Sequence, residues 1–193
     1  MRGVNDRKYP SWDGKKILKE YDLWRRLIAR CSQKIWDKHP TYKGTHFSDN
    51  FSNYSFFYEW CQTQAGFCNK DEKGRYWHLD KDLLIKGNKL YSEDTCVFIP
   101  TELNKLLTKR DNQRGDFPVG VTWHKTKEKF IASYSNGKGY PRHIGNFDCV
   151  EQAFQAYREH KEAYIKSLAE QYKSQLDPRA YQALLNYTVE ITD

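Results

Sequence analysis

Residues 120–157 read GVTWHKTKEKFIASYSNGKGYPRHIGNFDCVEQAFQAY, and this stretch decides the fold of the C-terminal third of the chain. Short extended runs separated by turn-forming residues predict short strands. Three strands are expected, at Val119 to His124, Lys129 to Ser135 and Arg142 to Phe147. Turns are expected at Lys125 to Glu128 and at Asn136 to Gly139, where Asn136-Gly137 is a hairpin signature. The pattern predicts an antiparallel sheet.

A long helix is predicted after the third strand. Asp148 is expected to cap this helix, and Glu151, three residues later, completes a capping box. Small alanines stand where the helix and the sheet must approach closely. The predicted inner stripe consists of Ala153, Ala156, Tyr157, His160, Tyr164 and Leu168. The tail after Asp177-Pro178 is expected to form a short helix and an extended end, which either docks on the long helix or pairs with another copy.

The same stretch resembles the Apetala-two/ethylene-response-factor DNA-binding domain. The family pattern GV-x-W/Y…K-W/F-x-A…LG-x-F-D-T-x-E-x-A-x-x-A-Y is followed from Gly120 to Tyr157. The resemblance implies a three-stranded sheet laid in the major groove of DNA, with the helix packed behind it.

Strand alternation predicts which side chains of this sheet meet DNA. The side chains expected to face the helix are Val121, Phe130 (or Ile131), Ile144 and Phe147. Those expected to point outward are Trp123, Lys125, Lys129, Tyr134 and Arg142. Arg142 is expected to pair with guanine, while phosphates are neutralised by Lys125, Lys127, Lys129 and Lys138. The alternative is that Trp123 and Tyr134 belong to the core and the lysines only keep a small sheet soluble.

The segment Tyr76 to Thr108 reads as strand, turn, strand and helix. Residues 77–84 alternate imperfectly, Gly87-Asn88 is a strong turn signal, and Cys96 to Ile99 suits a second strand. Thr101 is expected to be the N-cap of the helix that follows. The leucines predicted for its inner side are Leu103, Leu106 and Leu107.

This middle segment resembles the core of HNH endonucleases. The residues that carry the resemblance are Leu79 to Asp82, Gly87-Asn88, Tyr91-Ser92, Thr95-Cys96 and Asn104. Phage homing endonucleases that join such a core to an Apetala-two-like module look similar over nearly the whole chain, including the stretches Trp24 to Cys31 and Pro40 to Gly44. The resemblance implies a bacteriophage endonuclease of this type.

The resemblance also implies a metal site. Asp80 lies where the family has its first metal ligand, and Asn104 lies where it has the ligand on the helix; oxygen donors suit Mg²⁺ or Mn²⁺ better than zinc. Lys81 stands where the general-base histidine is expected, and lysine serves poorly unless its pKa is strongly depressed. His78 or Asp82 could substitute for it. The expected catalytic residues are therefore His78, Asp80, Lys81 and Asp82.

Other interpretations of the same residues stay open. Asp80 and Asp82 can simply cap a turn, with Asn104 an exposed helix residue. A degenerate core would make the protein a non-catalytic DNA-binding regulator that uses the same sheet. A third alternative is an interaction factor whose basic face meets an acidic protein.

The N-terminal region is predicted to be helical. One apolar face is formed by Leu23, Trp24, Leu27, Ile28 and Cys31, and a second helix is expected from Tyr54 to Gln64. Arg25, Arg26 and Arg30 occupy the opposite face. Between Lys15 and Lys43 the chain carries nine Lys or Arg against three acidic residues. This charge indicates either contact with DNA phosphates or a solvated helix face.

The composition of the chain limits the partners and the cellular location that these hypotheses allow. The 193-residue chain has a net charge of +7 and a pI near 9.0, which favours polyanionic partners. No apolar run reaches the roughly 18 residues of a membrane span, and the N-terminus lacks the apolar stretch of a signal peptide. A cytoplasmic location is therefore expected, which is the host-cell cytoplasm if a phage encodes the protein. The five cysteines contain no CxxC pair, which fits reduced, buried thiols; the alternative is zinc bound by Cys61 and Cys68 with His46 or His78.

Together these patterns predict an α+β protein with N-terminal helices, a small ββα-metal (HNH-like) core, and a C-terminal three-stranded antiparallel sheet packed on one long helix. Two domains are expected, residues 1–110, with the core at about 76–108, and residues 111–193, joined by a polar linker at 109–115. The expected function is metal-dependent hydrolysis of phosphodiester bonds in double-stranded DNA, guided by sequence. The target sequence and the oligomeric state stay open.

Overall fold

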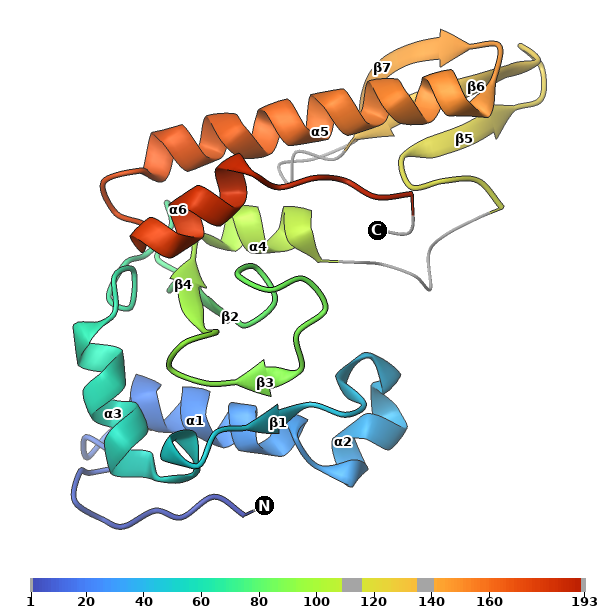
Figure 1. The fold of residues 1–193 in the computed structure, drawn as a ribbon. Helices are drawn as coiled ribbons and strands as arrows, with labels where there is room; N and C mark the ends of the chain where they lie inside the picture. Colours follow the sequence, from blue (N-terminus) through green and yellow to red (C-terminus); the bar gives the residue numbers. More distant parts are fainter. Residues whose placement is uncertain (1, 109–115, 135–140, 192–193) are drawn as a thin grey trace. The chain divides into compact units, whose positions relative to one another are not determined.

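The computed structural model describes residues 2–108, 116–134 and 141–191, and it separates into two compact units, Met1–Ile99 and Pro100–Asp193 (Figure 1). The predicted linker at 109–115 and the predicted turn at 136–139 lie outside the described residues. The units divide before α4 (Thr101–Leu107), whereas the sequence placed the domain boundary after residue 110. A side-chain hydrogen bond explains the difference, because Tyr164 Oη of α5 (Val150–Tyr172) donates to Glu102 Oε1 of α4 at 2.7 Å.

The first unit joins helices to pairs of very short strands. Its described elements are α1 (Lys19–Arg30), α2 (Gln33–Lys38), the 3₁₀ turns η1 (Pro40–Tyr42) and η2 (Asn50–Ser52), α3 (Tyr54–Thr63), β1 (His46–Phe47), β2 (His78–Asp80), β3 (Leu90–Tyr91) and β4 (Val97–Ile99). Strand β1 pairs with β3 in parallel, and β2 pairs with β4 antiparallel. The two predicted N-terminal helices are confirmed as α1 and α3.

Large rings fill the core of the first unit. Phe51, Tyr54 and Phe57 are fully buried. Phe51 and Phe57 meet edge to face with their centroids 5.1 Å apart, and the indole Nε1 of Trp24 donates to the Phe51 carbonyl oxygen at 2.9 Å. Asn53 caps α3, because its side chain accepts hydrogen bonds from the next turn. Aromatic bulk compensates here for a small supply of aliphatic side chains.

The middle segment departs from its prediction in three ways. Strand β2 spans three residues instead of the eight expected, because Asp80 Oδ1 accepts from the amides of Asp82 (2.8 Å) and Leu83 (2.7 Å) and turns the chain. Pro100 occupies the N-cap position of α4, so the predicted cap at Thr101 is wrong; Thr101 is the first helical residue. The two strands pair as a ββα core requires, but α4 belongs to the second unit, and that core is not confirmed.

The second unit contains the predicted sheet and long helix. Its strands β5 (Val121–His124), β6 (Lys129–Tyr134) and β7 (Arg142–Phe147) form an antiparallel sheet in the order β5-β6-β7, and α5 packs along one face (Figure 1). The buried cluster between them consists of Val121, Ala132, Ala153, Tyr157 and Val189. The prediction of a three-stranded antiparallel sheet packed on one long helix is confirmed.

Close approach between sheet and helix depends on Gly120. Its φ is +79°, and a Cβ built there would lie 2.0 Å from Cδ2 of Tyr157. The predicted capping box is wrong, because α5 begins at Val150 with Cys149 at its N-cap and no side-chain capping bond. The Asp148 carboxylate instead pairs with the ammonium of Lys129 on β6.

The C-terminal tail docks on its own unit. Helix α6 (Pro178–Leu185) packs on α5, and Asp177 caps it by accepting from the Arg179 amide. Val189 is 2% exposed, and its amide donates to Glu162 Oε1 of α5 at 2.8 Å. Of the two predicted outcomes for the tail, docking on the long helix is the one observed. Among the described helices, none has the length and apolar character that crossing a membrane demands.

Candidate functional site

The sheet of the second unit has one covered and one open face, and strand pairing assigns each side chain to a face. Trp123 is paired with Phe130, and their rings lie 4.8 Å apart. Because Val121 and Trp123 are two residues apart on β5, both lie on the side of α5. The predicted outward direction of Trp123 is therefore wrong, although its side chain stays 40% exposed at the rim.

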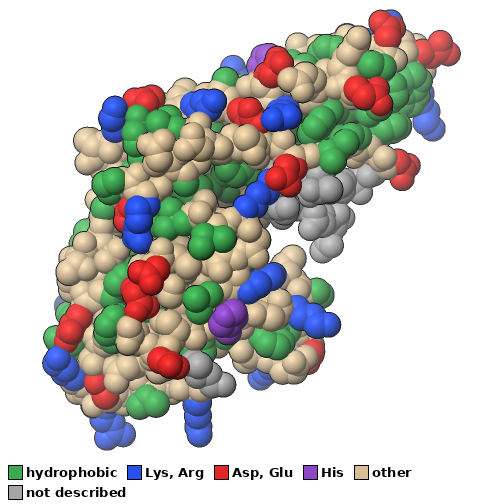
Figure 2. All heavy atoms as spheres, in the orientation of Figure 1, with side chains coloured by type: hydrophobic (Ala, Val, Ile, Leu, Met, Phe, Trp, Pro, Cys, Tyr) green, Lys and Arg blue, Asp and Glu red, His purple; other side chains and the backbone are tan. Residues whose placement is uncertain are grey.

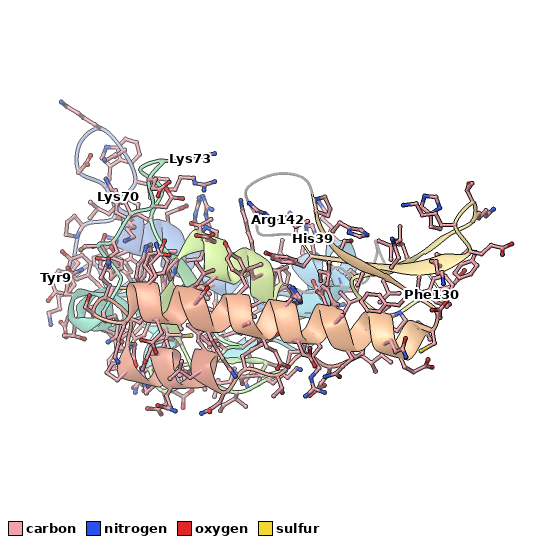
Figure 3. All side chains as sticks on the ribbon, turned by 90° about the horizontal axis from the view of Figure 1, so that it is seen from above. Tyr9, His39, Lys70, Lys73, Phe130 and Arg142 are labelled. Carbon is pink, nitrogen blue, oxygen red and sulfur yellow. The ribbon has the colours of Figure 1, made fainter. Side chains whose placement is uncertain are left out.

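Tyr134 and Arg142 were also predicted on the wrong face. The Tyr134 ring lies 5.8 Å from that of Tyr164 and 6.3 Å from that of His160, and both partners belong to α5. Arg142 pairs with Tyr134 across β6 and β7, so it shares the helix side, where it is exposed (Figure 3). For Trp123 and Tyr134 the alternative interpretation, that these rings pack at the core, agrees with the structure.

The open face carries mostly polar side chains. It consists of Thr122, His124, Lys129, Ile131, Ser133, His143 and Asn146. Of the predicted DNA-contacting residues, Lys129 lies on this face, and Lys125 and Lys127 are exposed in the turn between β5 and β6. Lys138 lies outside the described residues. The face therefore combines hydrogen-bonding groups in its middle with ammonium groups at one end.

An irregularity between β6 and β7 decides what the open face displays. Ala132 pairs with Gly145, but the next residue, Ser133, pairs with His143, so Ile144 is an extra residue on β7. The bulge places His143 and Asn146 on the same face although they are three residues apart. The ring nitrogen Nε2 of His143 lies 3.1 Å from Asn146 Oδ1, which holds the two side chains together.

Charge is distributed differently on the two sides of this unit. The Lys129 ammonium pairs with Asp148, whereas the structure gives Lys125 and Lys127 no ion pair within the described ranges. The Lys127 amide donates to Nδ1 of His124 at 3.3 Å and so fixes that ring beside the turn. Along the outer surface of α5, acidic and basic side chains are interleaved (Figure 2). The turn and open face are thus better suited to a polyanion than the helix surface.

The second candidate site is the Asp80 loop, residues 78–91 of the first unit. Asp80 stands at the end of β2, and the two backbone amides it accepts hold one carboxylate oxygen in place. Burial raises the pKa of Asp80, and these two hydrogen bonds act against that rise. A fixed, partly buried carboxylate at a strand end is a suitable ligand for a hard divalent cation.

Lys81 is held tightly inside this loop. Its side chain is 9% exposed, and its ammonium pairs with Asp82 and donates to the Asn88 carbonyl oxygen at 2.6 Å. It also lies 5.6 Å from the centroid of the Tyr91 ring. The Asn88 side chain returns two hydrogen bonds, to the carbonyl oxygens of Lys81 (2.8 Å) and Leu90 (2.7 Å). An ammonium with these bonds acts as a positively charged crosslink of the loop.

Of the remaining predicted catalytic and metal-binding residues, His78 and Asp82 belong to the Asp80 loop and Asn104 does not. His78 is exposed on β2 two residues before Asp80, so the two share a side of the strand. Asp82 is half exposed and committed to Lys81. Asn104 lies on α4 of the second unit and is not part of the Asp80 loop. Within the described ranges no three His, Cys, Asp or Glu side chains form a group that could hold a metal, and this includes the alternative zinc set.

The three predicted arginines of α1 divide into two kinds. Arg25 and Arg26 are 57% and 65% exposed, and both pair with Asp22 one turn earlier. Arg30 points inward instead, with its guanidinium 3.5 Å from Tyr91 Oη and 5.4 Å from the centroid of the Tyr42 ring. Tyr91 is thus shared by Arg30 and Lys81, which gives the Asp80 loop a cationic surrounding.

Sequence reasoning missed most residues of the open face: Thr122, His124, Ile131, Ser133, His143 and Asn146. Val121 is an apolar residue expected inside. Strict alternation from it puts Thr122 and His124 on the opposite, open face, so these two could have been identified. Nothing in the sequence marks Ile144 as an extra residue, so the pairing of His143 with Asn146 had no signal.

No known protein family, no curated protein and no solved structure matches this chain. The resemblances to the Apetala-two and HNH families therefore stay predictions.

Proposed function

We propose that this protein binds double-stranded DNA through the open face of its C-terminal sheet. The observation that carries the proposal is a β-sheet closed on one side by α5 and polar on the other, with lysines in the turn beside it that form no ion pair among the described residues. A small antiparallel sheet fits the major groove of B-DNA, where base edges offer hydrogen-bond donors and acceptors.

The residues of the open face divide between two tasks. His143, Asn146, Ser133 and Thr122 carry groups that pair with base edges, and their strands hold them in one plane. Lys125 and Lys127, in the adjacent turn, carry the positive charge that phosphates require. Because Asn146 is oriented by its contact with His143, this pair is the best candidate for reading sequence.

Selection of duplexes from a random pool, followed by fluorescence anisotropy on the selected site, tests this proposal. The double variant His143→Ala/Asn146→Ala is expected to lose roughly tenfold in affinity for the selected site and little for unrelated duplexes. Gln152→Ala/Ser167→Ala, on exposed positions of α5, is the control and should bind as wild type. Equal affinity of both double variants for the selected site would exclude the open face as the reading surface.

A second candidate function is metal-dependent cleavage of the bound DNA, which makes the protein an endonuclease. The observation in its favour is the Asp80 carboxylate, fixed at a strand end with His78 on the same side of β2. Asp80 would hold Mg²⁺ or Mn²⁺, which would polarise the scissile phosphate, and His78 would accept the proton of the attacking water. Lys81 would hold the loop in shape.

Plasmid nicking with Mg²⁺ or Mn²⁺ distinguishes the endonuclease from a DNA-binding regulator. Asp80→Ala and His78→Ala are expected to lower nicking at least a hundredfold, whereas Asp37→Ala on α2 should leave it unchanged. Equal nicking by wild type and Asp80→Ala would remove Asp80 from the mechanism. An absence of nicking by the wild type with either metal would favour the regulator.

A further inference from the structure

A second concentration of positive charge lies in the first unit. Two hairpins form it, residues 11–19 and 69–77, which together carry six cationic and three acidic side chains. In the first hairpin Trp12 bridges to Ile17, and in the second Lys70 bridges to Tyr76. We call the exposed side of these hairpins the two-hairpin surface, defined by Lys15, Lys16, Lys19, Lys70, Lys73 and Tyr76.

Lys19 joins the two hairpins. Its ammonium donates to the Phe67 carbonyl oxygen and lies 3.7 Å from the centroid of the Phe67 ring and 3.8 Å from that of Tyr76. The ammonium of Lys70 lies 4.6 Å from the centroid of the same Tyr76 ring. One exposed phenol ring therefore holds two ammonium groups near each other.

The acidic side chains of these hairpins are mostly used by their own turns. Asp13 accepts from the amides of Lys15 (2.9 Å) and Lys16 (2.8 Å). Asp71 accepts from the amides of Lys73 and Arg75 and pairs with the Arg75 guanidinium at 2.6 Å. Glu72 and, beside Lys19, Glu20 are further acidic residues near the lysines, and no ion pair of Lys15, Lys16, Lys70 or Lys73 occurs among the described residues. Figure 3 shows Lys73 reaching outward from its hairpin.

The like charges also affect each other. Burial, as the largest cause, lowers the pKa of Lys19; Glu20 acts against this, and the Lys70 ammonium, as the smallest of the causes, acts with it. An anion placed between the two hairpins would relieve this repulsion. A chain of phosphates fits better than a single anion, because the lysines are spread over two turns.

We infer that the two-hairpin surface is a second DNA contact, which binds phosphates of the duplex backbone without reading its sequence. This inference rests on the proposed function, because it assigns the same ligand to a separate surface. Lysines on flexible stems provide point charges and lack the planar groups that read base edges, which suits backbone contact. A membrane surface fits less well, since interfacial binding needs a continuous apolar face and only Trp12, Ile17 and Tyr76 are exposed apolar groups here.

The dependence of affinity on salt concentration tests the inference. Each phosphate neutralised adds about 0.9 to the slope of log K against log salt concentration. The variant Lys15→Gln/Lys16→Gln/Lys70→Gln/Lys73→Gln is expected to lower this slope by roughly 2 to 3.5 for both selected and unrelated duplexes. The control Lys166→Gln/Lys173→Gln removes two exposed lysines, one on α5 and one at its C-cap, and should leave the slope unchanged. The corresponding fourfold Lys→Arg variant should keep the wild-type slope.

The outcomes separate this inference from the proposed function. A lower salt slope in the fourfold Gln variant, with its preference for the selected site retained, supports the two-hairpin contact. The variant His143→Ala/Asn146→Ala should instead keep the slope and lose the preference for the selected site. An unchanged slope in the fourfold variant overturns the two-hairpin contact and leaves the open-face proposal standing. A wild type that binds no duplex overturns both. Binding to phosphatidylserine vesicles that falls in the fourfold variant, with DNA binding unaffected, would assign the surface to membranes instead and overturn the inference.

Discussion

At the scale of single residues, Gly120 is the glycine at which a larger side chain is expected to be tolerated least. Replacing it with alanine adds a methyl group against the Tyr157 ring at a positive φ, so both the backbone and the packing are strained. We expect Gly120→Ala to lower the free energy of unfolding by about 2–4 kcal/mol in urea titrations followed by circular dichroism. Gly74→Ala is the control, because Gly74 has a φ of +72° but open space around it, and should cost about 1 kcal/mol. Equal losses would contradict the packing argument.

Asp80 carries a carboxylate whose charged form is disfavoured by burial. Because burial raises its pKa in the folded state above 3.8, its contribution to stability is complete below that value and is lost as pH rises through the folded pKa. Asp80→Asn keeps the acceptor oxygen for the amides of Asp82 and Leu83 but carries no charge. We expect this variant to melt at a higher temperature than wild type at pH 7, with the difference shrinking as pH falls toward 4.

Thermal melting between pH 4 and pH 8 measures this difference. A melting temperature of Asp80→Asn that stays below that of wild type at every pH would show that the negative charge stabilises the loop. A stabilised variant would mean that the native carboxylate is kept at a cost to stability, which is common for functional residues.

At the scale of elements, the turn between β5 and β6 carries backbone strain. Glu128 has a φ of 48°, a left-handed conformation that costs a residue with a Cβ about 1 kcal/mol. We expect Glu128→Gly to raise the free energy of unfolding by up to about 1 kcal/mol, less the added freedom of glycine in the unfolded chain. Thr126→Gly in the same turn is the comparison, because it gains the same freedom without relieving a positive φ, and it should destabilise. If Glu128→Gly lowered the free energy of unfolding as much as Thr126→Gly does, the backbone strain at Glu128 would contribute nothing measurable to stability.

Elements were predictable where periodicity was strong and long. Helices α1, α3 and α5 each have an apolar stripe, the three strands of the sheet are short extended runs separated by turn-forming residues, and all were found near their expected positions. The two helix caps were not predictable, although Asp148 and Thr101 both have side chains that can cap a helix. The Asp148 carboxylate pairs with Lys129 instead, and Pro100 already occupies the N-cap position before Thr101. Local sequence preference gave way to contacts formed by the fold.

The candidate site was harder to predict than the fold. Lys129 was placed on the correct face, and Lys125 and Lys127 on the exposed turn. Trp123, Tyr134 and Arg142 were placed on the wrong face, because strand alternation puts Trp123 on the side of Val121, Tyr134 on the side opposite Lys129, and Arg142 with its partner Tyr134. For Lys81, the sequence indicated an unusual residue at the position of a base, but only the structure supplies its bonds to Asp82 and Asn88.

At the scale of the whole molecule, each unit has its own core, so the two units are expected to unfold with separate responses to mutation. Phe57→Ala removes a fully buried ring from the first unit and should cost about 3–5 kcal/mol there. Differential scanning calorimetry is expected to show this variant lowering one transition and Gly120→Ala lowering another. A single transition moved by both variants would show that the two cores unfold together.

The extra residue on β7 has a consequence for how such a surface can change. Deleting Ile144 would restore regular alternation through the strand and would leave every pair unchanged, with His143 opposite Ser133 on the open face and Gly145 and Phe147 toward the helix. Losing this one codon would thus keep the same polar groups on the open face and remove a side chain that packs against the buried cluster. A change in the groups that this face displays therefore requires substitutions at its own positions, such as His143 or Asn146.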